Sequence, residues 1–302
     1  MRISSLYHSS AMLHQMNNNG ARLSKLMEQM ATQKRVNVPS DDPVASSRLV
    51  QLNREQSAID QYQSNITRLS GNLSIQESHV TALSEQLLAL NDKLLAASND
   101  TYSEKDMGGF ANEMSQMLES LVSTMNAKNE DGHYIFSGTK TNTQPVVFDE
   151  ASKTYLYAGN DASRATTVAN GIEIAENTNI SQAFSGSNND LSMLNLLKTV
   201  SDKMATPGAD YRDDLKLLLG EAKKSSDSIA SVYTELGGKQ NRLTLIGDAH
   251  SDVKISHEQV IQELSALDAA TSYVNIQMYT QAVQASNKSF MMISQLSLFN
   301  QM

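Results

Sequence analysis

Two histidines, His250 and His257, lie seven residues apart, a spacing that could place two metal ligands together. Seven residues are close to two helical turns, so both imidazoles would lie on one face of a helix. Two nitrogen donors without a third ligand nearby make a weak site, because protein zinc sites use at least three protein ligands. We therefore interpret both histidines as seam or surface residues of a helix, and we expect no metal.

The adjacent pair Asp41-Asp42 could bind a cation or act as an acid and a base. Pro43 follows the pair, and proline fits the first turn of a helix, where its missing N–H is not needed. Ser40, Asp41 or Asp42 could cap the first free N–H groups of that helix. Capping explains these residues fully, so we interpret Asp41, Asp42 and Pro43 as a structural motif.

Other signals for chemistry are weak or absent. Residues 137–143 (SGTKTNT) have a glycine and a lysine beside hydroxyls, but they lack the second glycine of a phosphate-binding loop and the helix that follows it. The sequence contains no HExxH and no GxSxG motif. It has no cysteine, which excludes disulfides, thiol redox chemistry and Cys-ligated zinc. We predict no catalytic, cofactor-binding or metal-binding residue, and therefore no enzyme.

The composition favours long helices. The 302 residues include no Trp, 4 Pro and only 5% aromatic residues. The net charge of −9 argues against nucleic acid as a partner. No segment has the roughly 20 apolar residues that would span a membrane. The first twenty residues lack the apolar core of a cleavable signal peptide, so we expect any export to proceed without cleavage.

Apolar residues recur every seven positions between residues 52 and 97, which predicts a long helix in a coiled coil. One set of positions is Leu52, Ile59, Ile66, Leu73, Val80, Leu87 and Leu94, and the other is Tyr62, Leu69, Leu83, Leu90 and Ala97. The helix should weaken at 98–109 and be followed by a shorter helix that ends before Gly132. A second shorter helix over 189–204 should stop at Pro207-Gly208.

A similar alternation of three and four residues runs from Leu215 to Met278. Because the two long segments have similar lengths, we expect them to fold back on each other as an antiparallel pair. Polar residues in the seams usually set register or lie where no third helix covers them. These residues are Glu55, Gln76, Lys239, His250 and His257.

Residues 131–188 are rich in short β-prone runs separated by turn residues. Asn170-Gly171 lies between two such runs and is a strong hairpin signal. We expect Tyr134-Ile135-Phe136 to start the first strand, Ser137-Gly138-Thr139 to turn the chain, and Pro145 to lead into the next strand. The predicted fold is therefore mainly α, a long antiparallel helical coiled coil or bundle with a small β-rich domain inserted at its far end.

Both ends of the chain are also amphipathic and helical in pattern, and nearly free of acidic residues. Such helices could simply pair within a monomer, or they could be fully buried only in an assembly, which is the reading we favour. The candidate assembly residues are Ile3, Leu6, Leu13, Leu23, Met27, Val274, Met278, Ala285, Met292, Leu296 and Leu298. We expect these ends to be mobile in the free subunit, because two such helices bury little area against a large ordering entropy.

Six segments resemble the flagellin-related axial proteins of the bacterial flagellum. They are residues 1–4 (MRIS), 31–46 (ATQKRVNVPSDDPVAS), 61–78, 134–146 (YIFSGTKTNTQPV), 235–243 (ELGGKQNRL) and 264–302. The Asp-Asp-Pro form and the run with Tyr134, Phe136 and Gly138 resemble the members that join hook and filament. Asn241 and Arg242 belong to a run similar to one in flagellin. The chain departs from the family at Gln33, where Gly is common, and at Val146, where Phe is common.

The resemblance implies a discontinuous layout. Residues 1–40 and 268–302 would form the innermost assembly domain, residues 41–130 and 189–267 a helical bundle, and residues 131–188 an outer domain. It implies a structural protein, exported through the flagellar type III channel with a chaperone and located outside the cell at the hook–filament junction. Its partners would be the proximal junction protein, flagellin and further copies of itself, but neither nucleic acid nor membrane.

Two other functions remain open. The chain could be flagellin itself, in which case the purified protein would assemble into long filaments. It could also be another type III-exported coiled-coil surface protein or adhesin, in which case residues 131–188 would bind a host surface.

Overall fold

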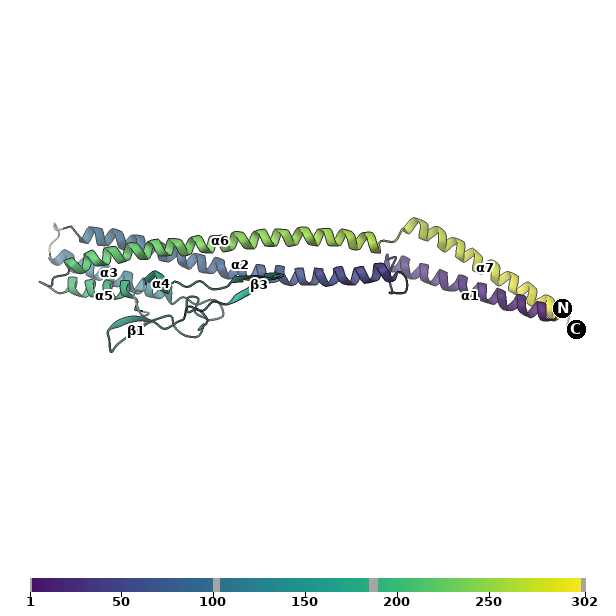
Figure 1. The fold of residues 1–302 in the computed structure, drawn as a ribbon, viewed down its shortest axis with the longest axis horizontal. Helices are drawn as coiled ribbons and strands as arrows, with labels where there is room; N and C mark the ends of the chain where they lie inside the picture. The colour runs from purple at the N-terminus through teal and green to yellow at the C-terminus, as the bar shows by residue number, and fades with distance from the viewer. Residues whose placement is uncertain (1, 100–103, 185–189, 300–302) are drawn as a thin grey trace. The chain divides into compact units, whose positions relative to one another are not determined.

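The computed structural model describes the backbone of residues 2–99, 104–184 and 190–299, and the side chains in these ranges except those of 2–6, 8, 9, 104, 105 and 294–299. The described part contains seven helices and four short strands (Figure 1). The helices are α1 (Arg2–Thr32), α2 (Pro43–Ala97), α3 (Glu104–Met125), α4 (Ser181–Phe184), α5 (Ser192–Ala205), α6 (Arg212–Ser265) and α7 (Ala269–Phe299). The strands are β1 (Val146–Asp149), β2 (Thr154–Tyr157), β3 (Ala165–Ala169) and β4 (Ile172–Ala175).

These elements confirm the predicted fold class, which is mainly α with a small antiparallel β region. Pro43 is the first residue of α2, and α5 ends at Ala205, just before Pro207-Gly208, as expected. The expected weak segment 98–109 is partly outside the described residues, and α3 has already begun at Glu104. No helix in the described part is long and apolar enough to cross a membrane.

The chain divides into two compact units, which we treat separately. Unit 1 contains residues 1–58 and 251–302, and unit 2 contains residues 59–250. The long helices α2 and α6 each contribute residues to both units.

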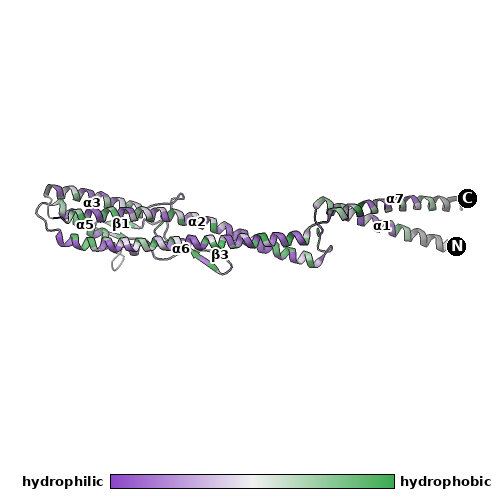
Figure 2. Cartoon of the chain, turned by 90° about the horizontal axis from the view of Figure 1, so that it is seen from above, coloured by the Kyte–Doolittle hydropathy of each residue, from purple (hydrophilic) through white to green (hydrophobic). Residues whose placement is uncertain are grey.

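In unit 2, α2 and α6 pair in antiparallel orientation. Ser70 donates to Gln240 over 2.9 Å, and Asn91 donates to Ser226 over 3.1 Å, so the partner number falls as the α2 number rises. Hydrophilic and hydrophobic residues alternate along both helices (Figure 2), as expected for helices with one buried face. The antiparallel pairing predicted from the two heptad patterns is confirmed in this unit.

Two shorter helices complete the core of unit 2. Gln86 of α2 donates to Ser120 and Thr124 of α3, each over 3.0 Å, and Ser201 of α5 donates to the carbonyl oxygen of Ala111 over 2.8 Å. With helices on several sides, the α2 seam from Leu73 to Leu94 is fully buried. On α6 the buried seam positions are Leu215, Leu218, Ala222, Ser225, Ile229, Leu236 and Leu243.

The inserted segment forms two separate antiparallel hairpins, β1–β2 and β3–β4. The turn at Asn170-Gly171 and the start of β1 just after Pro145 confirm the sequence predictions. The strand predicted at Tyr134-Ile135-Phe136 is wrong. Tyr134 forms only an isolated bridge with Lys128, and the chain turns at once because the Phe136 ring is fully buried and its carbonyl oxygen accepts the Tyr157 hydroxyl.

The β3–β4 hairpin lies against the sides of α2 and α6, not at the far end of the helical pair as expected. Asn65 donates to the carbonyl oxygen of Thr167 over 2.9 Å, and Gln76 donates to that of Glu176 over 2.7 Å. The His250 Nε2–H donates to the carbonyl oxygen of Val168 over 2.8 Å. Polar seam residues therefore mark where a hairpin, instead of a third helix, covers the helical pair.

Candidate assembly surface

In unit 1, α1 and α7 lie side by side in antiparallel orientation. Arg22 donates to the Tyr279 hydroxyl over 3.0 Å, and the Arg22 guanidinium lies 5.9 Å from the centre of the same ring. Beyond α1, the backbone N–H of Arg35 donates to the carbonyl oxygen of Ser265 over 2.8 Å. These contacts hold the two ends of the chain together.

The buried side chains of this helix pair are polar. Within the described side chains of α1 and α7, the buried residues are Asn19, Gln29 and Ser272. Five of the candidate assembly residues are instead between 39% and 63% exposed. They are Leu13, Met27, Val274, Met278 and Met292. The pair therefore has apolar side chains on the outside and no buried apolar side chain in the described part.

The remaining candidates from the sequence divide into three groups. Leu23 is half-buried, and Ala285 is exposed. The side chains of Ile3, Leu6, Leu296 and Leu298 lie outside the described residues.

The loop between α1 and α2 is ordered by Asp41. Its carboxylate accepts the backbone N–H groups of Asn37 and Val38 over 3.0 and 3.2 Å and lies 2.7 Å from the Lys25 ammonium. The hydrogen bond from Lys25, followed by the two backbone N–H groups, lowers the pKa of Asp41 to about 2. Asp41 therefore ties the loop to the end of α1.

Asp42 caps α2, as one of the three residues proposed from the sequence. Its Oδ1 accepts the backbone N–H of Ala45 over 3.0 Å, and its Oδ2 lies 3.1 Å from the Arg35 guanidinium. The backbone bond first, and Arg35 second, lower the pKa of Asp42. Arg35 also donates to the carbonyl oxygen of Leu264 over 3.0 Å, so one guanidinium joins the start of α2 to the end of α6.

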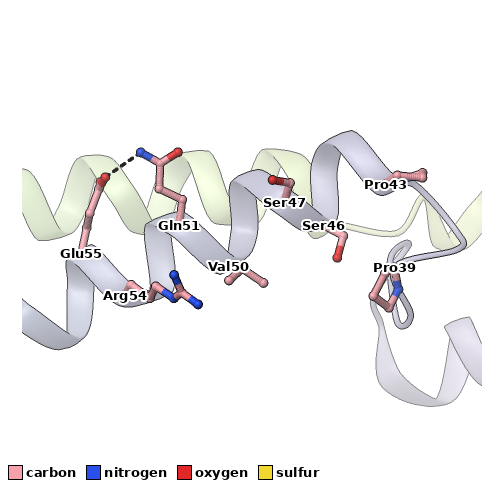
Figure 3. Close-up of a pocket in the computed structure, with 8 residues that line it drawn as sticks. All are labelled: Pro39, Pro43, Ser46, Ser47, Val50, Gln51, Arg54 and Glu55. Atoms are coloured by element: carbon pink, nitrogen blue, oxygen red, sulfur yellow. Dashed lines mark hydrogen bonds between the residues drawn. The ribbon is translucent and has the colours of Figure 1, made fainter.

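Beside this loop, α2 carries an open groove of about 480 Å³ (Figure 3). Its lining combines apolar Pro39, Pro43 and Val50 with Ser46 and the cationic Arg54. Figure 3 shows Val50 and Arg54 pointing to the same side of the helix. The sequence did not predict this groove. It forms where the loop with Pro39 turns beside the first turns of α2, and no single residue type marks such a place.

In unit 2, Tyr134, Phe136 and Gly138 form a tight corner between the helices and the hairpins. The Tyr157 hydroxyl donates to the carbonyl oxygen of Phe136 over 2.8 Å, and burial raises the pKa of Tyr157 to about 12. Gly138 has φ +71°, and a Cβ there would overlap the carbonyl oxygen of Asn160. This segment of the sequence is therefore a packed corner.

Asn241 and Arg242 are exposed on α6, and the structure gives neither side chain a hydrogen-bond or ion-pair partner among the described residues. The two histidines of the α6 seam do not come together on a metal. His250 stacks on Tyr62 with ring centres 5.5 Å apart, whereas His257 lies 3.5 Å from the Glu55 carboxylate. The described residues contain no group of three or more His, Asp or Glu placed to hold a metal ion.

Comparison with known proteins identifies relatives over almost the whole chain. Residues 3–141 match the bacterial flagellin N-terminal helical region. The chain is 29% identical over 312 residues to flagellar hook-associated protein 3 of Escherichia coli K12, which covers 96% of this chain and 98% of that protein. It is 27% identical to the protein of the same name from Salmonella typhimurium LT2, with 99% of each chain covered.

Solved structures agree with these sequence matches. A structure of a flagellar hook-associated protein from Vibrio parahaemolyticus is 33% identical and covers 75% of this chain and 100% of its own, with a TM-score of 0.69. Flagellar hook-associated protein 3 from Legionella pneumophila is 17% identical with a TM-score of 0.64, and this likeness concerns the fold alone.

Proposed function

The chain belongs to the family of flagellar hook-associated proteins, and we propose from this premise that it is a structural subunit of the junction between flagellar hook and filament. Two relatives that span nearly its whole length carry the name flagellar hook-associated protein 3. In this role the protein transmits force and provides a template for the filament, without performing a reaction.

The observation that best supports this function is the exposed apolar face of α1 and α7. A lone pair of helices in a soluble monomer would bury its apolar side chains, whereas Met27, Val274 and Met278 are each more than half exposed. An assembly in which neighbouring helices cover this face would remove that area from water. Ordering of the chain ends and assembly of the layer would then be coupled.

The partners follow from the position of such a layer. One side of it would contact the proximal junction protein and the other side flagellin, and neighbouring copies of the chain would lie between. Terminal helices that are fully ordered only in the assembly would also suit capture by an export chaperone before passage through the type III channel. Residues 131–188 would form the outer part of each subunit.

Deletion of the gene in the parent bacterium tests this function. We expect hooks without filaments, with flagellin lost to the medium, and immuno-electron microscopy should find the protein between hook and filament. Normal filaments in the deletion strain would refute the junction assignment.

A second experiment distinguishes this function from that of flagellin, because the N-terminal helical region is shared with flagellin. Purified protein that polymerises alone into long filaments would indicate a filament subunit. We expect short oligomers at most.

A further inference from the structure

We propose that the groove on α2 in unit 1 binds the outer face of α6 from a second copy of this chain, with Arg54 of one copy paired to Asp252 of the next. This inference rests on the proposed function as a layer of identical subunits, and it identifies one lateral contact in that layer.

The groove is suited to a partner with both apolar and acidic side chains. Pro39, Pro43 and Val50 line it with apolar surface, and Val50 is 49% exposed. Arg54 has no ion pair or hydrogen bond with any residue that the structure describes. Gln51 and Glu55, at the edge, are already joined by a hydrogen bond of 2.9 Å (Figure 3). The Glu55 carboxylate also lies 3.5 Å from His257 of α6, so Arg54 is the charged lining residue left without a partner among the described residues.

The outer face of α6 offers the complementary chemistry. Ile255 is 64% exposed, so its apolar side chain is available to a partner. Asp252, three residues earlier and on the same face, is exposed and has no ion pair or hydrogen bond within the described residues. One apolar and one acidic side chain thus match Val50 and Arg54.

These two surfaces lie on opposite sides of the helix pair in unit 1. At 100° per residue, Pro43, Val50 and Arg54 lie about 160–200° around α2 from the buried Leu52. Asp252 and Ile255 lie about 160–220° around α6 from His257, which faces Glu55 of α2. Two different complementary surfaces on opposite sides make a heterologous contact, which generates a ring or a helical layer.

The order of the residues also sets the direction of the contact. If Arg54 meets Asp252 and Val50 meets Ile255, the two helices run antiparallel. Ser47 of one copy then faces Gln259 of the next, and both side chains are exposed in the isolated chain. The natural chain contains no cysteine, so every disulfide of this protein that forms in the experiment joins introduced cysteines.

Disulfide cross-linking tests this contact in flagella isolated from cells that carry the variant as their only copy. The double variant Ser47→Cys/Gln259→Cys should give a ladder of dimers, trimers and larger oligomers under a mild oxidant. Neither single variant should cross-link with itself, and flagella from cells that express both single variants together should give dimers and nothing larger. Dimers of either single variant would indicate an isologous contact and overturn the proposal.

Charge reversal in the double-cysteine chain tests the ion pair. Arg54→Glu should lower the cross-linked fraction about tenfold, because attraction becomes repulsion, and adding Asp252→Arg should restore it to within about threefold. Arg68→Glu is the control, an exposed arginine on the same helix but outside the groove lining, and it should leave the fraction unchanged within about twofold. Failure of the second reversal to restore cross-linking would overturn the Arg54–Asp252 pair.

Two further readouts separate this proposal from the proposed function. Circular dichroism of each purified variant shows whether the helices are intact, and immunogold labelling shows whether it reaches the junction. Labelled junctions without a ladder refute the groove contact alone. A ladder formed by the concentrated purified protein, with no label in flagella, refutes the junction function and leaves the contact in place.

Discussion

Gln33 follows the last residue of α1 with φ +55°, a left-handed conformation that favours glycine. The departure from the family pattern at this position therefore carries a conformational cost. We expect Gln33→Gly to stabilise unit 1 by about 0.5–1 kcal/mol, since the relief of strain exceeds the added freedom of the unfolded chain. Thermal unfolding measures this effect. The neighbouring Lys34→Gly should destabilise unit 1. If both variants lowered the thermal stability of unit 1 equally, the conclusion that the left-handed backbone at Gln33 carries a cost would be refuted.

Gly138 and Gly132 provide a matched pair for the corner in unit 2. Both have positive φ, but a Cβ at Gly132 meets open space whereas one at Gly138 overlaps Asn160. We expect Gly132→Ala to cost about 1 kcal/mol from the backbone alone, and Gly138→Ala about 2–4 kcal/mol, because the corner must also shift. Denaturant unfolding of the two variants compares them. If both variants lost the same free energy of unfolding, the backbone around Gly138 would be able to shift and accept a Cβ without further cost.

Asp41 gives the protein a defined acid dependence. Its native pKa of about 2 lies below the ordinary value of 3.8, so its contribution to stability is complete above pH 3.8 and is lost as the pH falls through about 2. Removal of the principal partner in Lys25→Met should raise the Asp41 pKa. Titration of the carboxyl groups followed by NMR measures the Asp41 pKa. A pKa near 3.8 in the unmodified chain would contradict the hydrogen bonds assigned to the Asp41 carboxylate.

The sequence predicted the roles of some of these residues and not of others. The Asp42 cap could be predicted because a cap acts within one helical turn, and Asp-Pro marks that turn. The partners of Asp41 could not, because Lys25 lies sixteen positions away and meets it only after the loop has turned. The strand expected at Tyr134 failed for a similar reason, since a distant hydroxyl, that of Tyr157, takes the carbonyl oxygen of Phe136.

Among the elements, the heptad pattern predicted both long helices, but not how well each stretch is buried. Most seam residues of α6 between Leu215 and Leu243 are buried, whereas none is buried from Ile246 onward. The alternation of apolar residues continues through both stretches, with polar seam positions at Lys239 in the first and at His250 and His257 in the second. What differs is the number of neighbours, because α3, α5 and the hairpins cover unit 2 whereas unit 1 has only helix pairs in its described part. A periodic sequence specifies a face but not what covers it.

The β3–β4 hairpin depends on hydrogen bonds from polar seam residues. His250→Phe keeps a ring to stack on Tyr62 but removes the donor to the Val168 carbonyl oxygen. We expect a loss of about 1–2 kcal/mol and faster amide exchange in the hairpin, with α2 and α6 still helical. Hydrogen exchange locates the effect.

Tyr62→Phe is the control, because it preserves the stack and the described residues give its hydroxyl no partner. It should change stability by less than about 0.5 kcal/mol. If the β3–β4 amides exchanged as slowly in His250→Phe as in the unmodified chain, the hydrogen bond from His250 to Val168 would not be what holds the hairpin.

At the scale of the whole molecule, the two units differ in what stabilises them. Unit 2 has a continuous apolar core that includes Leu73, Leu87, Leu218 and Phe136. Unit 1 buries Val36, Ala45 and Leu52 near the loop, but the described side chains of α1 and α7 bury only polar groups. Buried apolar area is the main favourable term in folding, so the terminal pair should be the first part to open.

Hydrogen exchange and limited proteolysis of the free protein test this order. Amides in 1–38 and 269–302 should exchange orders of magnitude faster than those of α2 and α6 in unit 2, because helices without a buried apolar face are marginal in water. The same amides should become protected in isolated flagella, where neighbouring subunits cover Met27, Val274 and Met278. Met278→Ser should leave the stability of unit 2 unchanged and weaken incorporation into flagella. Equal protection of both units in the free protein would mean that the terminal helices are preformed, and that assembly does not order them.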